Sequence, residues 1–215
     1  MPKKTRDVIV ASSDWTVPSA DGVHRRTIVK GAAWTVPVVA VAMATPAAAA
    51  SEAFVCPTVP ASSGWTKPVT SGTSTGPGVY EWSTDGTEWQ NTKDSTKADS
   101  FSYYIEFSFK GVAGHSYTFN WSAYASGARN TANYAAYDVT IGGNQVYTAS
   151  TDGNYGGGAS FIDPNTKARV SASKTFTPTT DGTYTFRYTV RLSQLASTQD
   201  ANHDVWIKMP TLTCS

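Results

Sequence analysis

The chain of 215 residues is poor in the residue types from which many metal and redox sites are built. It contains only two cysteines and three histidines, and charged residues make up 15% of it. There is no CxxC pair and no spacing of cysteine and histidine that suits zinc. A zinc site or a redox centre is therefore not indicated.

Strong charge and helical periodicity are also missing after residue 50. Residues 51–215 carry 11 lysines and arginines against 13 aspartates and glutamates, a net charge of −2. A nearly neutral domain lacks the basic footprint that binds nucleic acid or anionic lipid. No amphipathic helical window of useful length occurs there, although 165 residues suffice for one domain with a core. We therefore expect no nucleic-acid partner and no helical fold.

The N-terminal 50 residues have the three parts of an export signal. In HRRTIVKGAAWTVPVVAVAMATPAAAAS (24–51), basic residues precede an apolar run that ends in small residues: Arg25, Arg26 and Lys30, then 31–43, then Ala48–Ala50. The paired arginines, apolar pair and lysine resemble the twin-arginine export motif, and the composition of the leader resembles that of leaders from high-GC Gram-positive bacteria. The alternative is a retained anchor, in which case the uncleaved leader would be the only contact with a membrane.

The leader divides the chain into three predicted parts. Residues 1–50 form a signal peptide with a long polar lead-in, and residues 51–78 form an irregular arm or a loose first strand, because they are rich in Pro, Gly, Ser and Thr without periodicity. Residues 79–215 form the folded domain. For an exported chain, Cys56 and Cys214 predict a disulfide that joins the two ends.

Two-residue alternation dominates the domain and predicts strands. In FSYYIEFSF (101–109) every odd position is apolar: Phe101, Tyr103, Ile105, Phe107 and Phe109. The same pattern recurs in SYTFNWSAY (116–124), in GTYTFRYTVRL (182–192) and in DVWIKMPTLTC (204–214), and YDVTIGGNQVYTAS (137–150) predicts a hairpin that turns at Gly142 and Gly143. Many short strands with one polar face each indicate an all-β, antiparallel β-sandwich.

Two strand phrases, GVAGHSYTFNWSAYA (111–125) and FTPTTDGTYTFRYTV (176–190), resemble those of extracellular bacterial jelly-roll modules, many of which bind carbohydrate. The resemblance implies a jelly-roll-like sandwich and a glycan partner. It assigns no residue, because a fold does not determine function.

Catalytic and metal candidates are few. We expect His115 and His203 to be surface residues of polar turns. A glycoside-cleaving enzyme would need paired carboxylates, and Glu106 beside Glu88 or Glu81 is the one pairing that a concave sheet could bring about. No cofactor is predicted apart from a structural calcium, for which a glycine-rich loop offers oxygen ligands: Asp152, Asn154 and Asp163.

Aromatic residues with polar neighbours are the main candidates for ligand binding, because a flat apolar face with a hydrogen-bond donor suits a sugar ring. The predicted set is Tyr104 and Trp206, on outward strand positions, and Trp82 and Trp89, at the two ends of a predicted hairpin loop; Tyr134 and Tyr155 lie in polar, glycine-rich segments. The sequence thus favours a secreted or cell-surface, non-catalytic binding domain for glycan or cell-wall polymer. The alternatives are a structural or adhesion protein that contacts another surface protein, and the glycoside-cleaving enzyme.

Overall fold

The structure is a computed structural model that describes residues 53–127, 133–197 and 200–215. Ala53–Ser215 forms one compact unit. The predicted export motif, Arg25, Arg26 and Lys30, lies outside the described residues, so export by the twin-arginine route stays a prediction.

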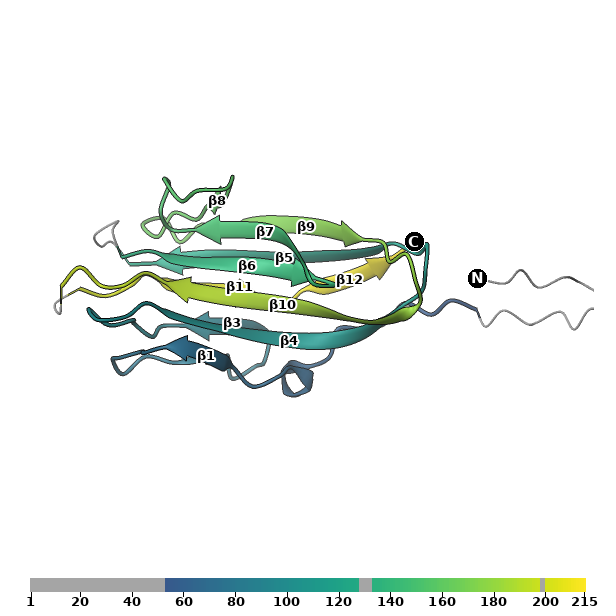
Figure 1. Cartoon of the computed structure of the whole chain (residues 1–215), viewed down its shortest axis with the longest axis horizontal. Helices are drawn as coiled ribbons and strands as arrows, with labels where there is room; N and C mark the ends of the chain where they lie inside the picture. Colours follow the sequence, from purple (N-terminus) through teal and green to yellow (C-terminus); the bar gives the residue numbers. More distant parts are fainter. Residues whose placement is uncertain (1–52, 128–132, 198–199) are drawn as a thin grey trace, which may run out of the picture. The chain divides into compact units, whose positions relative to one another are not determined.

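The described residues form a β-sandwich of two six-stranded sheets, as the alternation predicts (Figure 1). The first sheet has the order β1 (Val69–Gly72), β4 (Phe101–Gly111), β10 (Gly182–Leu192), β6 (Ala135–Ile141), β7 (Asn144–Ser150) and β8 (Ser160–Phe161). The second sheet has the order β12 (Thr211–Cys214), β5 (Tyr117–Ser126), β11 (Asp204–Lys208), β3 (Glu88–Asn91) and β2 (Tyr80–Trp82), with β9 (Val170–Phe176) paired to β5. All named pairs are antiparallel except β7 with β8.

The core lies between the sheets and is built from alternate residues of the long strands. In β4 every odd position from Phe101 to Phe109 is buried, and β5 buries Tyr117, Phe119 and Trp121 in the same way. Aromatic rings from the two sheets meet across the core; Phe119 and Phe186, for example, have ring centroids 4.7 Å apart. The two-residue period therefore separates the core face of each strand from its outer face.

The hairpin between β6 and β7 turns at Gly142 and Gly143, as predicted. Their φ angles are 59° and 87°, a left-handed conformation that glycine adopts without steric cost. A Cβ on Gly142 would also lie 2.8 Å from the ring of Phe176, so this position is closed to a side chain.

The segment before residue 79 takes the form of a loose first strand rather than a wholly irregular arm. It contains a short 3-10 helix, η1 (Ser62–Gly64), and strand β1, which pairs with β4. Between them Trp65 is buried and stacks on Tyr188 of the core at 5.6 Å between centroids. One tryptophan thus ties a sequence without periodicity to the sandwich.

The predicted disulfide is confirmed. Cys56 and Cys214 are bonded, with Cα atoms 5.7 Å apart, across a sequence separation of 158 residues. A structural disulfide between the ends of the domain fits an extracellular protein, because such bonds persist in oxidising compartments.

Among the described residues, no helix has the length and apolar character that a membrane crossing requires.

Candidate functional site

An aromatic pair stands on the outer face of the second sheet. Tyr124 of β5 is the direct cross-strand partner of Trp206 of β11, and both occupy positions that alternate with core residues. Their ring planes differ by 3° and the ring centroids are 4.7 Å apart. At that separation the rings are stacked on each other rather than laid side by side, so they form one rigid aromatic unit.

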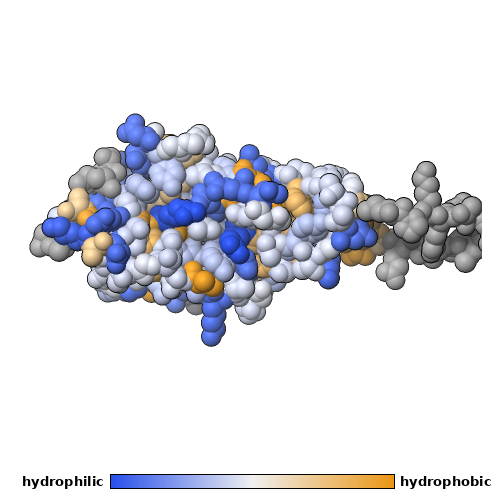
Figure 2. All heavy atoms as spheres, viewed as in Figure 1, coloured by the Kyte–Doolittle hydropathy of each residue, from blue (hydrophilic) through white to orange (hydrophobic). Residues whose placement is uncertain are grey.

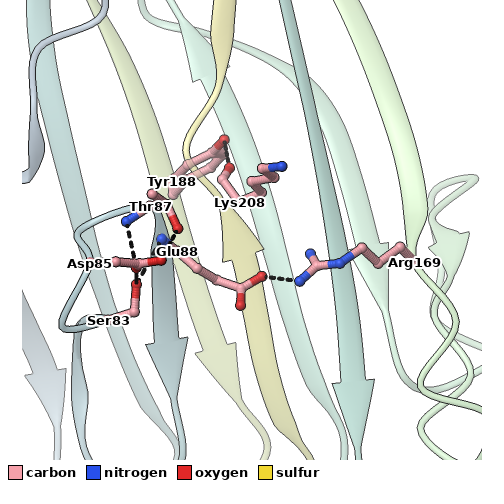
Figure 3. A network of polar contacts seen from close by, with 7 residues as sticks. All are labelled: Ser83, Asp85, Thr87, Glu88, Arg169, Tyr188 and Lys208. Carbon is pink, nitrogen blue, oxygen red and sulfur yellow. Dashed lines mark hydrogen bonds and ion pairs between the residues drawn. The ribbon is translucent and has the colours of Figure 1, made fainter.

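Arg169, which precedes β9, completes the stack. Its guanidinium carbon lies 4.7 Å from the centroid of the Tyr124 ring, a cation–π geometry. Its Nη2 donates to Oε1 of Glu88 at 2.5 Å, and Figure 3 shows the two side chains reaching towards each other across the strands that lie between them. Burial raises the pKa of the Tyr124 phenol, the negative charge of Glu88 raises it further, and Arg169 opposes the shift. The hydroxyl of Tyr124 therefore remains a hydrogen-bond donor at neutral pH.

The turn between β2 and β3 holds Glu88 in place. Asp85 accepts hydrogen bonds from the Ser83 hydroxyl at 2.6 Å and from the Thr87 backbone N–H at 3.1 Å (Figure 3). The Ser83 hydroxyl in turn accepts the backbone N–H of Glu88 at 3.0 Å. The turn thus fixes the backbone from which Glu88 reaches Arg169.

We expect the carboxyl of Asp85 to titrate below the usual aspartate range. Hydrogen bonds from the Ser83 side chain, and then from Thr87, favour the ionised form and lower the pKa. A folded-state pKa below the unfolded value stabilises the hairpin above the unfolded pKa, and this stability is lost as the pH falls through the folded pKa. Carbon-13 NMR titration of the carboxyl should show a low midpoint that rises in Ser83→Ala; an identical midpoint in both proteins would contradict the assignment.

A groove of about 420 Å³ lies on the outer face of the same sheet. Its polar rim consists of hydroxyl and amide side chains and one ammonium group: Asn120, Ser122, Ser171, Ser173, Thr211 and Lys208. Ser122 and Lys208 lie two residues along their strands from Tyr124 and Trp206, so groove and stack are adjacent. Among the described residues, the Lys208 ammonium forms no ion pair and can donate to a ligand. The combination offers an apolar surface beside a row of hydrogen-bonding groups.

The structure brings two of the four predicted ligand-binding aromatics together, Trp82 and Trp89, and places the other two on opposite sheets. Trp206 is half-buried on the outer face of the second sheet, as predicted, whereas Tyr104 is half-buried on the outer face of the first sheet, where the guanidinium of Arg187 lies 3.8 Å from its ring centroid. Trp82 lies on β2, packs edge-on against Trp65 at 5.1 Å and against Trp89 at 5.5 Å, and lines a pocket of about 310 Å³ with both. The four residues therefore do not form one site, although Trp82 and Trp89 share a pocket.

Trp89 belongs largely to the core. It is 2% exposed, and its indole N–H donates to the hydroxyl of Tyr103 at 2.9 Å. It also lines the pocket of about 310 Å³ that it shares with Trp82, so a ligand-binding role for Trp89 stays a prediction. Tyr124, which sequence reasoning did not single out, is the residue that joins Trp206 on the outer face; its alternation with Ala123 and Ala125 was the signal that could have identified it.

The two histidines behave differently. His115 is half-buried and stacks on Phe54 at 3.8 Å between centroids. His203 is 1% exposed, and its Nδ1 lies 2.7 Å from the hydroxyl of Thr151, so the expectation of a surface histidine is wrong there. Its hydrogen-bond partner is 52 residues away in the sequence, which is why the local polar sequence misleads.

The glycine-rich loop engages its acidic residues in turns. Asp152 Oδ1 accepts the backbone N–H of Asn154 at 2.9 Å, and Asp163 Oδ1 accepts the backbone N–H of Asn165 at 2.9 Å. Both are Asx turns. In the described part of the chain, no three or more His, Cys, Asp or Glu side chains gather in a way that could hold a metal ion. A structural calcium at Asp152, Asn154 and Asp163 stays a prediction.

Among the described residues, neither the carboxylate pair of a glycoside-cleaving enzyme nor a nucleophile elbow is formed where the sequence offers it. Glu106 lies on the outer face of the first sheet, bound by Arg187 at 2.7 Å, whereas Glu88 lies on the outer face of the second sheet. The stretch GTSTG (72–76) has the GxSxG spacing, but the chain runs from it into β2 rather than into the helix that a nucleophile elbow requires.

No protein-family model and no curated protein matches the sequence. Among solved structures, the chain is similar to the carbohydrate-binding module TmCBM61 in complex with β-1,4-galactotriose, with a TM-score of 0.36 and 12% identity over 72% of this chain and 91% of that chain. It is also similar to the enzymatically active domain of tailspike protein 4 of bacteriophage CBA120, with a TM-score of 0.38 and 13% identity over 71% of this chain and 20% of that chain.

Proposed function

We propose that the chain is an extracellular, non-catalytic binding domain for a glycan or cell-wall polymer, and that the outer face of the second sheet is its binding surface. The observation that carries the proposal is the stack of Tyr124 on Trp206 at the end of a groove with a polar rim. A sugar chain presents apolar ring faces and a hydroxyl on nearly every carbon. We assign the apolar complement to the ring of Trp206, because both faces of the Tyr124 ring are covered, and the hydrogen-bonding complement to the rim of the groove.

The site is held in place before any ligand arrives. Arg169 covers one face of Tyr124 and Trp206 covers the other, while the ion pair with Glu88 fixes the guanidinium. Groups that are already ordered lose little conformational entropy on binding, so more of the contact energy appears as affinity. The groove is lined by residues of β5, β9 and the β11–β12 segment and lies next to the stack, so a ligand of more than one sugar ring can contact both.

The charge of the face favours a neutral ligand with many hydroxyls. Glu88 neutralises Arg169, so Lys208 is the one cation of the rim that remains for a ligand oxygen. One lysine is too little for a polyanion, whose binding relies on several cations at once.

The test is a binding assay with the whole protein and insoluble cellulose, chitin, β-1,4-galactan and bacterial cell wall. We expect at least one polymer to bind and Trp206→Ala to weaken that binding by about 30-fold, because the loss of a central aromatic anchor typically costs about 2 kcal/mol or more. Melting curves of the same variant must show a folded protein.

Tyr104→Ala is the matched control. It removes a half-buried, cation-covered tyrosine from the outer face of the opposite sheet, so it should leave polymer binding unchanged. Equal losses in both variants, or full binding by Trp206→Ala, would overturn the assignment of the surface. If the unaltered protein binds none of the polymers, the result contradicts the glycan proposal and favours the alternative of a structural or adhesion protein.

A further inference from the structure

A second, smaller pocket opens on the outer face of the first sheet, the face that Figure 2 shows as largely hydrophilic with separate hydrophobic spots. It has a volume of about 260 Å³ and lies beside the 151–159 loop. Side chains from three neighbouring strands and this loop line it together with Gly156 and Gly157: Asp138, Gln145, Thr148, Tyr155 and Arg191. The sandwich core separates it from the aromatic face, so either site can exist without the other.

A buried carboxylate forms the floor of the pocket. Asp138 points away from the core, yet its side chain is only 6% exposed. Its Oδ2 accepts from Nε of Arg191 at 2.7 Å, and its Oδ1 accepts from the Thr148 hydroxyl at 2.8 Å. Gln145 donates to the same hydroxyl at 2.8 Å. Because a buried charge is costly unless it is paired and hydrogen-bonded, this network fixes the position of every member.

Arg191 is held by one nitrogen only. Nearby on the same face, Arg187 uses both Nε and Nη2 on Glu106, each at 2.7 Å, and its plane covers Tyr104. Arg191 binds Asp138 through Nε, its side chain is 48% exposed, and its two terminal nitrogens have no recorded partner among the described residues. The guanidinium is therefore oriented by Asp138 with donors left over for a ligand.

The loop supplies an aromatic wall with a hydroxyl. Tyr155 is positioned by its backbone N–H, which donates to the carbonyl of Asp152 at 3.1 Å, and by edge contact of its ring with Tyr134 at 5.0 Å. Burial raises the pKa of the Tyr155 phenol, with smaller contributions from Tyr134 and Asp138. The phenol thus stays protonated and can donate. Gly157 has a φ of 77°, which lets the loop turn back beside the pocket.

We infer that this pocket binds a single uncharged sugar ring, with adjacent hydroxyls on the Asp138–Arg191 pair and the ring against Tyr155. The ion pair is neutral as a unit, so an added anion would meet the charge of Asp138 and an added cation would meet that of Arg191. A vicinal diol accepts from Arg191 and donates to Asp138 or Gln145 without adding a charge. The volume lies below the usual range for ligand pockets, about 300–1,000 Å³, and therefore suits one ring rather than a chain.

The experiment is a nitrogen-15 NMR titration of the whole protein with the methyl glycosides of galactose, glucose and mannose, and with glucuronate and glucosamine as charged probes. We expect at least one neutral glycoside to shift the amide signals of Tyr155, Gly156 and Gly157 at millimolar concentration, and the charged probes to bind more weakly. Arg191→Lys should weaken that binding about tenfold, because lysine keeps the charge and loses the planar fork.

Two further variants distinguish this pocket from general effects. Arg187→Lys, on the same face, and Trp206→Ala, on the aromatic face of the proposed polymer site, should both leave the glycoside titration unchanged. Tyr155→Phe keeps the aromatic ring that lines the pocket and removes one hydroxyl donor, so it should weaken glycoside binding. The inference is overturned if no neutral glycoside shifts these amides, if charged probes bind better, or if Arg191→Lys and Arg187→Lys have equal effects.

Discussion

Replacement of both disulfide cysteines, Cys56→Ser with Cys214→Ser, is expected to lower the melting temperature by roughly 10–20 °C. The bond closes a loop across 158 residues. In the chain-entropy model such a cross-link destabilises the unfolded chain by about 5 kcal/mol, and about 1 kcal/mol shifts the melting temperature of a domain of this size by roughly 2–4 °C. The native contacts of the sandwich are otherwise unchanged, so the effect acts mainly through the unfolded state.

Differential scanning calorimetry of the double variant and the unaltered protein measures this effect. Reduction of the unaltered protein with a thiol is the control and should reproduce the shift of the double variant. The intact mass of the oxidised protein should lie about 2 Da below the reduced mass, with both cysteines in one linked peptide. Equal melting temperatures for the oxidised and the serine-substituted proteins would show that the bond adds nothing to stability.

The sequence predicts the sandwich well because its long strands carry a strict two-residue period. In β4 and β10 the alternation extends over many residues, and the buried and outer faces fall where the pattern places them. The disulfide was predictable because the two cysteines leave a single pairing within the chain. The first feature follows from the local alternation of residues and the second from the number of cysteines. Neither requires knowledge of which strands are neighbours.

The candidate sites depend on which strands lie next to each other, and the sequence pattern does not give these strand pairings. Tyr124 and Trp206 meet only because β5 and β11 pair in one register, and Arg169 reaches Glu88 across a separation of 81 residues. The alternation of β6 places Asp138 on the outer face and so predicts that it is exposed to solvent. In the structure, Arg191 and Thr148 bind its carboxylate and the side chain is buried. Long-range register thus determines both proposed sites, whereas periodicity alone gives only the face.

Trp89 shows the limit of sequence reasoning for short elements. The sequence predicts a hairpin loop beside Trp89 but assigns the residue to neither face of a sheet, because strand β3 has only four residues, Glu88–Asn91. Its register partner on β11 is Ile207, a core residue, whereas the next residue, Gln90, is paired with Trp206. Two tryptophans on adjacent strands therefore face opposite sides of the same sheet.

This opposition predicts a large difference between two tryptophan variants. Trp89→Ala should reduce the free energy of unfolding by about 3–5 kcal/mol, because it leaves a cavity in the core where the indole now packs. It also removes the bond from its N–H to the Tyr103 hydroxyl, although Tyr103 still donates to Asn91 at 2.9 Å. Trp206→Ala removes an outer-face stacking partner and should cost only about 1 kcal/mol.

Urea unfolding followed by circular dichroism can compare the two variants directly. Trp89→Phe is the intermediate control, since it keeps a ring in the core, loses the hydrogen bond to Tyr103 and should fall between the two alanine variants. Trp206→Ala should be the most stable of the three variants, Trp89→Phe the next and Trp89→Ala the least stable. If Trp206→Ala is as unstable as Trp89→Ala, then Trp206 is a core residue, and a loss of polymer binding by that variant would report unfolding rather than a missing contact. If the predicted order holds, the Trp206 variant is stable enough for its loss of binding to be attributed to the missing outer-face indole rather than to unfolding.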